Sequence, residues 1–97
     1  MVSGPAASAK WPEFAQELGL NLRRARHAKD LTQEQMAELV GISLYAYQQY
    51  ERGASTKGGT ATNPRLATLL AICQALGTPI HDVLPDVPPL IASHLGR

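Results

Sequence analysis

The sequence predicts a compact all-α domain of five short helices. Apolar residues recur at helical spacing along most of the chain, and capping residues and glycines separate the helical stretches. No segment shows the alternating apolar and polar pattern of a half-buried strand. With 97 residues, 44% of them hydrophobic and 18% charged, the composition is that of one ordinary globular domain and excludes a disordered chain or a coiled-coil rod.

The first helix is expected to begin after a small, polar arm. Pro12 suits the first turn of a helix, because the N–H that proline lacks has no helical partner there. Apolar residues then share one helical face: Phe14, Leu18, Leu22 and Ala25. Gly19 lies inside this stretch and costs roughly 1 kcal/mol relative to alanine. We therefore predict a flexible arm over residues 1–12 and a helix that ends near residues 29–30.

The segment from Thr32 to Gly53 predicts two short helices joined by a tight turn. Thr32 and Gln35 have the spacing of a capping box, in which each side chain accepts a hydrogen bond from the backbone of the other residue. Gly41 suits the left-handed conformation that ends a helix, and Ser43 is a favoured N-cap for the next one. In that second helix, the expected inner residues are Ala46, Tyr47 and Tyr50.

A loop rich in Gly, Ser and Thr over residues 54–62 separates these helices from the rest of the domain. Asn63 as a cap and Pro64 at the first position predict a fourth helix, which Gly77 ends. Its apolar stripe is expected to consist of Leu66, Leu69, Leu70, Cys73 and Leu76. A short fifth helix is expected to start at Thr78–Pro79 and to carry Ile80, Val83 and Leu84.

The second of the two short helices presents an outer face suited to DNA. Its outer residues are expected to be Leu44, Tyr45, Gln48, Gln49 and Arg52. In a helix-turn-helix, one helix crosses the DNA backbone while the next enters the major groove, which is about 12 Å wide. Glutamine pairs with the adenine edge, and arginine pairs with guanine or phosphate. Residues 21–65 carry seven basic side chains against four acidic ones, which permits an anionic partner.

Several short segments follow one another in a recognisable order: Leu31–Glu34 with Ala37, Gly41–Ser43, Glu51–Gly53, Pro64 with Leu69–Leu70, and Ala75–Gly77. In this order and spacing the chain resembles the lambda-repressor-like helix-turn-helix family of phage repressors, antitoxins and restriction-modification controllers. The resemblance covers about residues 14–85. It implies a five-helix domain, here residues 13–85, in which the second and third helices bind DNA.

The resemblance implies roles for individual residues. Gln33 falls where the family contacts a phosphate and braces the recognition helix. The family's base-reading positions correspond to Leu44, Tyr45 and Gln49. Backbone contacts are common beside them, at Gln48 and Arg52. The full set of candidate DNA contacts is Gln33, Ser43, Leu44, Tyr45, Gln48, Gln49, Arg52, Lys57 and Arg65.

Arg26 and Glu51 match an arginine and a glutamate that pair structurally in the family, which makes Arg26 part of the scaffold. Two features depart from the family's pattern. Leu44 and Tyr45 replace the small or polar residues usual at those positions, and the loop before the fourth helix is several residues longer. In this loop, Lys57 beside two glycines suits a flexible phosphate contact, although the loop equally suits a partner protein or simple slack.

These features predict a sequence-specific, double-stranded DNA-binding transcriptional regulator, and more narrowly a repressor that occupies operator DNA as a homodimer. A dimer that reads two half-sites one DNA turn apart buries more surface on DNA than one such domain. We expect its interface at the fifth helix and the tail, residues 86–97, whose apolar residues are Leu90, Ile91 and Leu95. The alternative is an antitoxin-like or other protein-interaction module, with a toxin or anti-repressor as partner.

Other classes are disfavoured. No serine has a plausible local base, and no His, Cys or acidic residues have metal-ligand spacing, so we expect no enzyme, no metal and no cofactor. No apolar run approaches the ~18 residues of a membrane helix and no secretory signal is visible, which predicts a cytoplasmic protein without a membrane partner. Cys73 is expected to be a buried, inert thiol. Trp11 is expected either to pin the arm or to belong to a dimer surface.

Overall fold

The computed structural model describes residues 4–56 and 58–91. A 3-10 turn, η1 (Pro5–Ala7), precedes five α-helices, namely α1 (Trp11–Ala28), α2 (Gln33–Val40), α3 (Leu44–Arg52), α4 (Leu66–Leu76) and α5 (Ile80–Val83). Within these residues the β-type pairing is limited to an isolated bridge between Ala54 and Ala61. The predicted all-α class with five helices is confirmed.

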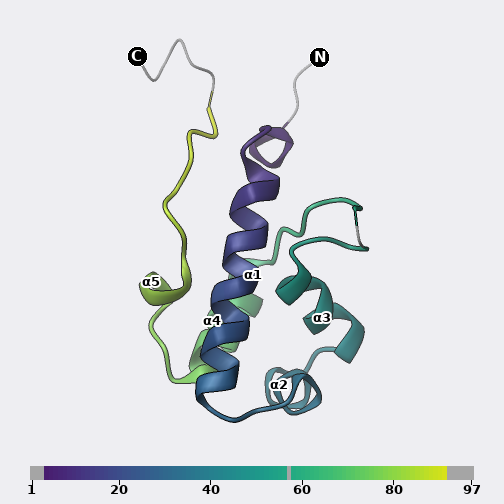
Figure 1. The fold of residues 1–97 in the computed structure, drawn as a ribbon, viewed down its shortest axis with the longest axis vertical. Coiled ribbons are helices and arrows are strands. Elements are labelled where there is room, and N and C mark those ends of the chain that lie inside the picture. Colours follow the sequence, from purple (N-terminus) through teal and green to yellow (C-terminus); the bar gives the residue numbers. More distant parts are fainter. Residues whose placement is uncertain (1–3, 57, 92–97) are drawn as a thin grey trace.

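The long helix α1 is the central element. In Figure 1, α2 and α3 lie to the right of α1, α5 lies to its left and α4 passes behind it. α3 packs directly against α1 and α2, while α4 bridges α2 and α5. This arrangement leaves the outer side of α3 turned away from the body of the domain (Figure 1).

The N-terminal boundary differs from the predicted arm over residues 1–12. Helix α1 already begins at Trp11, and η1 lies before it. Trp11 is half-buried: its ring stacks on Phe14 with centroids 5.1 Å apart, and its indole Nε1 donates to the carbonyl of Thr62 at 2.8 Å. An indole that stacks on a core ring and also has its N–H paired is held in place, which extends the ordered helix toward the N-terminus. The Trp11 side chain therefore also fixes the end of the 54–62 loop.

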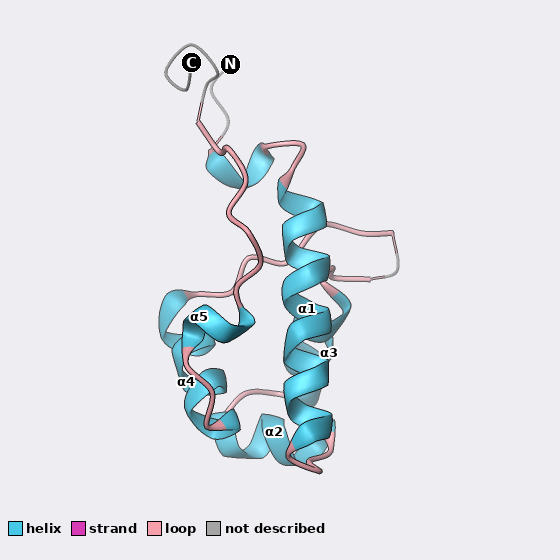
Figure 2. Ribbon diagram, turned by 60° about the vertical axis from the view of Figure 1, so that its left-hand side comes forward, coloured by secondary structure: helices cyan, strands magenta, loops and turns pink. Residues whose placement is uncertain are grey.

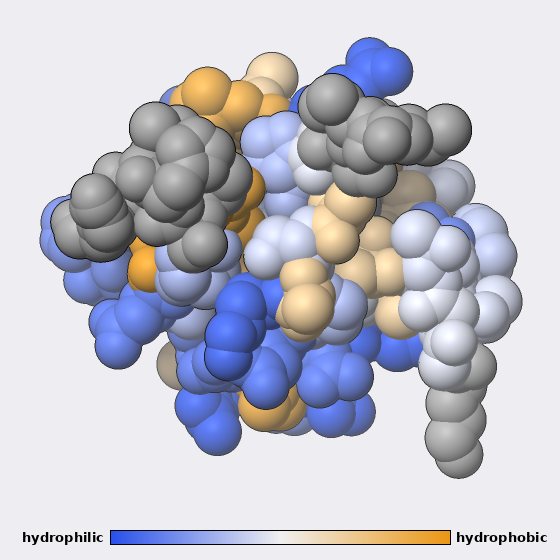
Figure 3. Space-filling view, turned by 90° about the horizontal axis from the view of Figure 1, so that it is seen from above, coloured by the Kyte–Doolittle hydropathy of each residue, from blue (hydrophilic) through white to orange (hydrophobic). Residues whose placement is uncertain are grey.

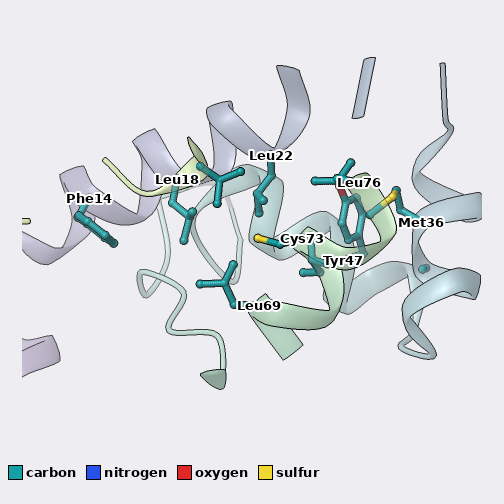
Figure 4. Packing of buried hydrophobic residues seen from close by; sticks show 11 residues of the cluster. Phe14, Leu18, Leu22, Met36, Tyr47, Leu69, Cys73 and Leu76 are labelled. Atoms are coloured by element: carbon teal, nitrogen blue, oxygen red, sulfur yellow. The ribbon is translucent and has the colours of Figure 1, made fainter. Parts of the chain in front are cut away.

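The core lies where the five helices meet (Figure 4). Leu69 and Cys73 of α4 point toward Leu18 and Leu22 of α1, and Tyr47 of α3 lies close to Met36 and Leu76 (Figure 4). The largest fully buried side chains are Leu22, Met36, Tyr47, Ile72, Leu76 and Val83. Each such burial contributes about 1.5–3 kcal/mol. Cys73 is a free, buried thiol as predicted, and burial raises its pKa.

Local capping sets the bounds of α2 and α3, as the sequence predicts. Oγ1 of Thr32 accepts from the backbone N–H of Gln35 at 3.0 Å, and Oε1 of Gln35 accepts from the N–H of Thr32 at 2.8 Å. Gly41 ends α2 with φ at 81°, a left-handed conformation that glycine adopts without strain. Oγ of Ser43 then accepts from the N–H of Ala46 at 3.0 Å and starts α3.

The capping box yields the first prediction. Replacing Thr32 by alanine removes the acceptor for the Gln35 N–H, and we expect the free energy of unfolding to fall by about 1 kcal/mol. Urea denaturation followed by circular dichroism measures this loss. Thr60→Ala is the control, because Thr60 is exposed and its hydrogen bond with Ser55 uses only the backbone carbonyl. Equal effects of the two substitutions would show that the box contributes nothing.

Helix α4 departs from the predicted stripe and start. Its N-cap is Arg65, not Asn63, and no side chain caps it. Leu66 and Leu70, predicted to be inside, are 66% and 40% exposed, whereas Ile72 is fully buried. Helix α4 is apolar nearly all round, so residue spacing alone does not decide which side is buried. Its packing against the neighbouring helices buries the side that carries Ile72 and exposes the side that carries Leu66 and Leu70. Two large leucines are left on the surface as a result.

After α5, the chain runs back beside α1 toward η1 (Figures 1 and 2). Nδ2 of Asn21 donates to the carbonyl of Val83 at 2.8 Å, which ties the end of α5 to α1. Leu90 is half-buried, while Val87 and Ile91 are 72% and 64% exposed. Leu95, in the predicted tail, lies outside the described residues.

The face at the η1 end of the molecule carries both polar and apolar residues (Figure 3). Seen from the η1 end, apolar residues form separate small groups among polar ones (Figure 3). In the part of the chain that the structure describes, no helix has both the length and the apolar character needed to cross a membrane.

Candidate DNA-binding site

The position of α3 depends on a close approach to α1 at Gly19. A Cβ atom at this position would lie 2.4 Å from the carbonyl oxygen of Glu51 and 2.7 Å from that of Tyr50. Both are backbone atoms of α3, so only glycine allows the two helices to lie this close. The glycine that weakens α1 as an isolated helix therefore sets the distance between α1 and α3.

The same helix pair is joined by a buried ion pair, which the family resemblance implies. Nε of Arg26 lies 2.6 Å from Oε2 of Glu51, and Nη2 lies 3.0 Å from Oε1, in a two-pronged contact. Nη1 of Arg26 donates to the carbonyl of Leu31 at 2.9 Å, just before the N-cap of α2. The side chains of the pair are only 9% and 4% exposed. One arginine thus joins α1, α3 and the segment that leads into α2.

Two further donors complete the hydrogen bonding of the Glu51 carboxylate. The hydroxyl of Tyr47 donates to Oε2, and Nε2 of Gln33 donates to Oε1 at 3.0 Å. Burial raises the pKa of Glu51, but the hydrogen bonds from Arg26, Tyr47 and Gln33 outweigh it and hold the pKa below its ordinary value of 4.5. Burial, together with the hydrogen bond to Glu51, raises the pKa of the Tyr47 phenol above its ordinary value. At neutral pH the cluster is an ionised pair with a neutral tyrosine.

The cluster extends to the surface through two glutamines. Oε1 of Gln33 accepts from Nε2 of Gln48 at 3.2 Å, while Nε2 of the same Gln33 is bound to Glu51. Gln33 is the first residue of α2 and Gln48 lies in the middle of α3. The amide of Gln33 therefore fixes the orientation of a candidate DNA contact relative to the buried ion pair.

The N-terminal half of α3 carries one exposed and one half-buried candidate for base reading. Tyr45 is 60% exposed and points away from the core. Leu44, also expected to contact a base, is half-buried and packs against the hydrophobic core. Ser43 caps the helix with its side chain. Tyr45 is therefore the candidate base-reading side chain with the greatest freedom to meet a ligand.

The C-terminal half of α3 supports the 54–62 loop. Nε2 of Gln49 and Nη1 of Arg52 both donate to the carbonyl of Ser55, at 3.3 Å and 3.0 Å. The N–H of Ser55 in turn donates to the carbonyl of Thr60 at 2.8 Å, which draws the two sides of the loop together. Gln49 thus has a structural contact as well as its expected base-reading role. Lys57, the loop's candidate phosphate contact, lies outside the described residues.

One functional candidate was missed by sequence reasoning. An open hollow of about 340 Å³ lies between α1, α2 and α3, lined by Arg23, Gln33, Gln48, Glu51 and Arg52. We call it the arginine hollow. Arg23 is not among the DNA contacts predicted from the sequence, because its proximity to α3 depends on the Gly19 approach and has no local signal. The remaining candidate, Arg65, is exposed at the start of α4 and does not line this hollow.

Comparisons with known proteins agree with this geometry. The helix-turn-helix domain family matches residues 17–84, more than half of the chain. Among solved structures, the chain is similar to the restriction-modification controller protein C.AhdI from Aeromonas hydrophila, with a TM-score of 0.62 and 27% sequence identity over 72% of this chain and 96% of that chain. No curated protein matches the sequence. The predicted resemblance is confirmed, and the chain belongs to the helix-turn-helix domain family, in its lambda-repressor-like form.

Proposed function

We propose that this protein is a sequence-specific DNA-binding transcription regulator that represses transcription by occupying operator DNA as a homodimer. The observation that carries the proposal is the outward face of α3, where Tyr45 is exposed and Gln48 is held in place by Gln33. A recognition helix reads base edges with side chains near its N-terminus, while its neighbours contact the backbone. The similarity to a restriction-modification controller supports a regulatory role.

In this proposal the two halves of α3 act differently. Tyr45 and Gln48 meet base edges in the major groove, with Leu44 beside them. Each primary amide nitrogen carries two hydrogens, so Gln48 keeps one for a base after donating one to Gln33. Gln49 and Arg52, which hold the loop through Ser55, lie further along the helix. Arg52 contacts the DNA backbone. Gln49 reads a base after its side-chain amide exchanges the Ser55 carbonyl for a base edge in the major groove.

The homodimer is proposed to form through α4, α5 and the tail. Leu66 and Leu70 leave apolar surface on α4. Beside them lies an open hollow of about 310 Å³, lined mainly by Leu70, Cys73, Pro79 and Ile80. A two-fold dimer that buries this apolar surface also holds its two copies of α3 at a fixed distance, so that each can bind one half-site of the DNA. Light scattering with and without DNA tests this part of the proposal.

The proposed function is tested by selecting duplexes from a random-sequence pool and footprinting the selected DNA. Two protected half-sites, bound in excess random competitor, are expected. Failure to enrich any duplex, together with capture of a defined protein partner, favours the antitoxin-like alternative.

The role of Tyr45 gives a second prediction. We expect Tyr45→Ala to weaken binding to the selected duplex about tenfold, the loss expected for one base-reading contact. Its thermal unfolding should stay unchanged, because Tyr45 is 60% exposed. Leu20→Ala, which truncates an exposed leucine on α1, is the control. Fluorescence anisotropy measures both, and equal affinities would remove Tyr45 from the interface.

A further inference from the structure

The arginine hollow carries an inference that rests on the proposed DNA binding and extends it beyond the helix-turn-helix pair. We propose that this hollow seats a backbone phosphate of the bound DNA, with Arg23 of α1 and Arg52 of α3 as its two cationic ligands. Arg23 then becomes a DNA contact that lies outside α2 and α3. The site belongs to three helices at once, and its residues are Arg23, Gln33, Gln48, Glu51 and Arg52.

The charge of the hollow favours an anion. Glu51 is its one acidic lining residue. That carboxylate already accepts four hydrogen bonds, two from Arg26 and one each from Tyr47 and Gln33. Four bonds fill the acceptor capacity of a carboxylate, and the charge of Arg26 balances its own. Two positive charges, on Arg23 and Arg52, are left to act on whatever enters the hollow.

The hollow also holds N–H donors with spare capacity. Arg52 uses only Nη1, toward the loop carbonyls of Ala54 and Ser55, which leaves Nε and Nη2. For Arg23, the described residues provide neither an ion pair nor a hydrogen-bond acceptor within bonding distance. The free N–H groups of the two arginines therefore supply the charged donors that a tetrahedral phosphate oxyanion accepts from.

Close packing and hydrogen bonds position the walls of the hollow. Gly19, one turn before Arg23, brings α1 against the backbone of α3 at Glu51. Gln33 spans from Glu51 to Gln48 across the α2–α3 side. Because Gln48 also faces the bases in the proposed complex, a phosphate bound here fixes the register of α3 in the groove. Phosphate contacts of this kind position a protein on DNA and carry no base preference of their own.

The test compares two neighbouring arginines of α1. Arg23→Ala is expected to weaken binding about tenfold per half-site, the loss of one charge-assisted hydrogen bond. Arg24→Ala removes the same charge from the next residue, which is exposed but does not line the hollow, and is expected to change affinity less than about twofold. The ratio of affinities for selected and scrambled duplexes should stay constant in both variants. Arg23→Lys should give an intermediate affinity, and thermal unfolding controls for folding.

A methylphosphonate scan of the selected duplex identifies the phosphate. Neutralising one phosphate per half-site should weaken the wild-type protein and leave Arg23→Ala with no further loss, since the two changes remove the same contact. Additive losses at every position, or equal losses for the Arg23 and Arg24 variants, would overturn the phosphate seat while leaving the proposed function standing. A wild-type protein that selects no duplex would instead overturn the proposed function, and the seat with it.

A second arm distinguishes the DNA backbone from a free anion. Inorganic phosphate is titrated into the labelled protein while the Nε–H signals of Arg23 and Arg52 are followed. Weak shifts that a selected duplex suppresses support the seat. Tight binding of inorganic phosphate, together with unchanged DNA binding in Arg23→Ala, would assign the hollow to a small anion and overturn the proposal.

Discussion

Replacing Glu51 with alanine is expected to lower the free energy of unfolding by about 3–5 kcal/mol, the largest loss among the substitutions considered. The change leaves the guanidinium of Arg26 buried without its carboxylate partner, and it removes the acceptor for Tyr47 and Gln33. An uncompensated buried charge is the main cost. Urea denaturation measures the loss, which is a large fraction of the 5–15 kcal/mol typical of a domain.

A matched variant separates the lost pair from the orphaned charge. In Arg26→Met/Glu51→Met both charges are replaced by apolar side chains, so the double variant should be markedly more stable than Glu51→Ala. If the double variant were as unstable as Glu51→Ala, the loss of stability would come from the packing of α1 on α3 and not from the buried charge.

Gln33→Ala tests the next contact along the cluster, because it removes a single neutral donor from Oε1 of Glu51.

The pair also has a pH signature. The pKa of Glu51 is lowered in the folded protein, whereas the unfolded carboxyl titrates near 4.5. Its stabilising effect is therefore complete above about pH 4.5 and is lost as the pH falls through the folded pKa. The difference in stability between the wild-type protein and Glu51→Gln should be constant near neutral pH and should shrink below pH 4.5. A difference that did not change with pH would contradict an ionised Glu51.

The second large effect is expected at Gly19. Alanine is the better helix former by about 1 kcal/mol, so intrinsic propensity alone predicts that Gly19→Ala stabilises α1. The structure predicts the opposite sign, because the new Cβ would lie 2.4 Å from the Glu51 carbonyl and α3 would have to move. We expect a net loss of about 3 kcal/mol, and weaker DNA binding, because the shift moves α3 relative to Arg23.

Thermal unfolding and anisotropy on the selected duplex measure both consequences. Gly4→Ala is the control, since a Cβ there would meet no atom within 4 Å. A Gly19→Ala protein that is as stable as the wild type, or more so, would show that the two helices are free to separate.

The sequence predicts best those parts of the fold that depend on neighbouring residues. The capping box of Thr32 and Gln35, the N-cap Ser43 and the left-handed Gly41 are all determined within a few residues along the chain, and each lies where it was predicted. The apolar stripe of α4 was predicted less well. Leu66 and Ile72 are equally suited to a core, and only the packing of α4 against its neighbours decides which is buried.

The candidate site divides in the same way. The order of short segments sufficed to indicate α2 and α3 as the DNA-binding pair. The contact of Gln49 with the Ser55 carbonyl and the position of Arg23 beside Arg52 depend on how distant segments meet. From the sequence, Gly19 is only a residue that destabilises its helix. In the structure it allows close contact with residues more than 30 positions away.

The way the 54–62 loop is anchored has a consequence for variation in this protein. The N–H of Thr62 donates to the carbonyl of Gly53, and the carbonyl of Thr62 accepts from Trp11, so the base of the loop is held by α1 and by the end of α3. Residues added at the tip would lengthen a closed loop whose ends stay fixed, at a cost of only about 0.6 kcal/mol for each doubling of length. The tip can therefore accept insertions and new side chains while α3 keeps its place.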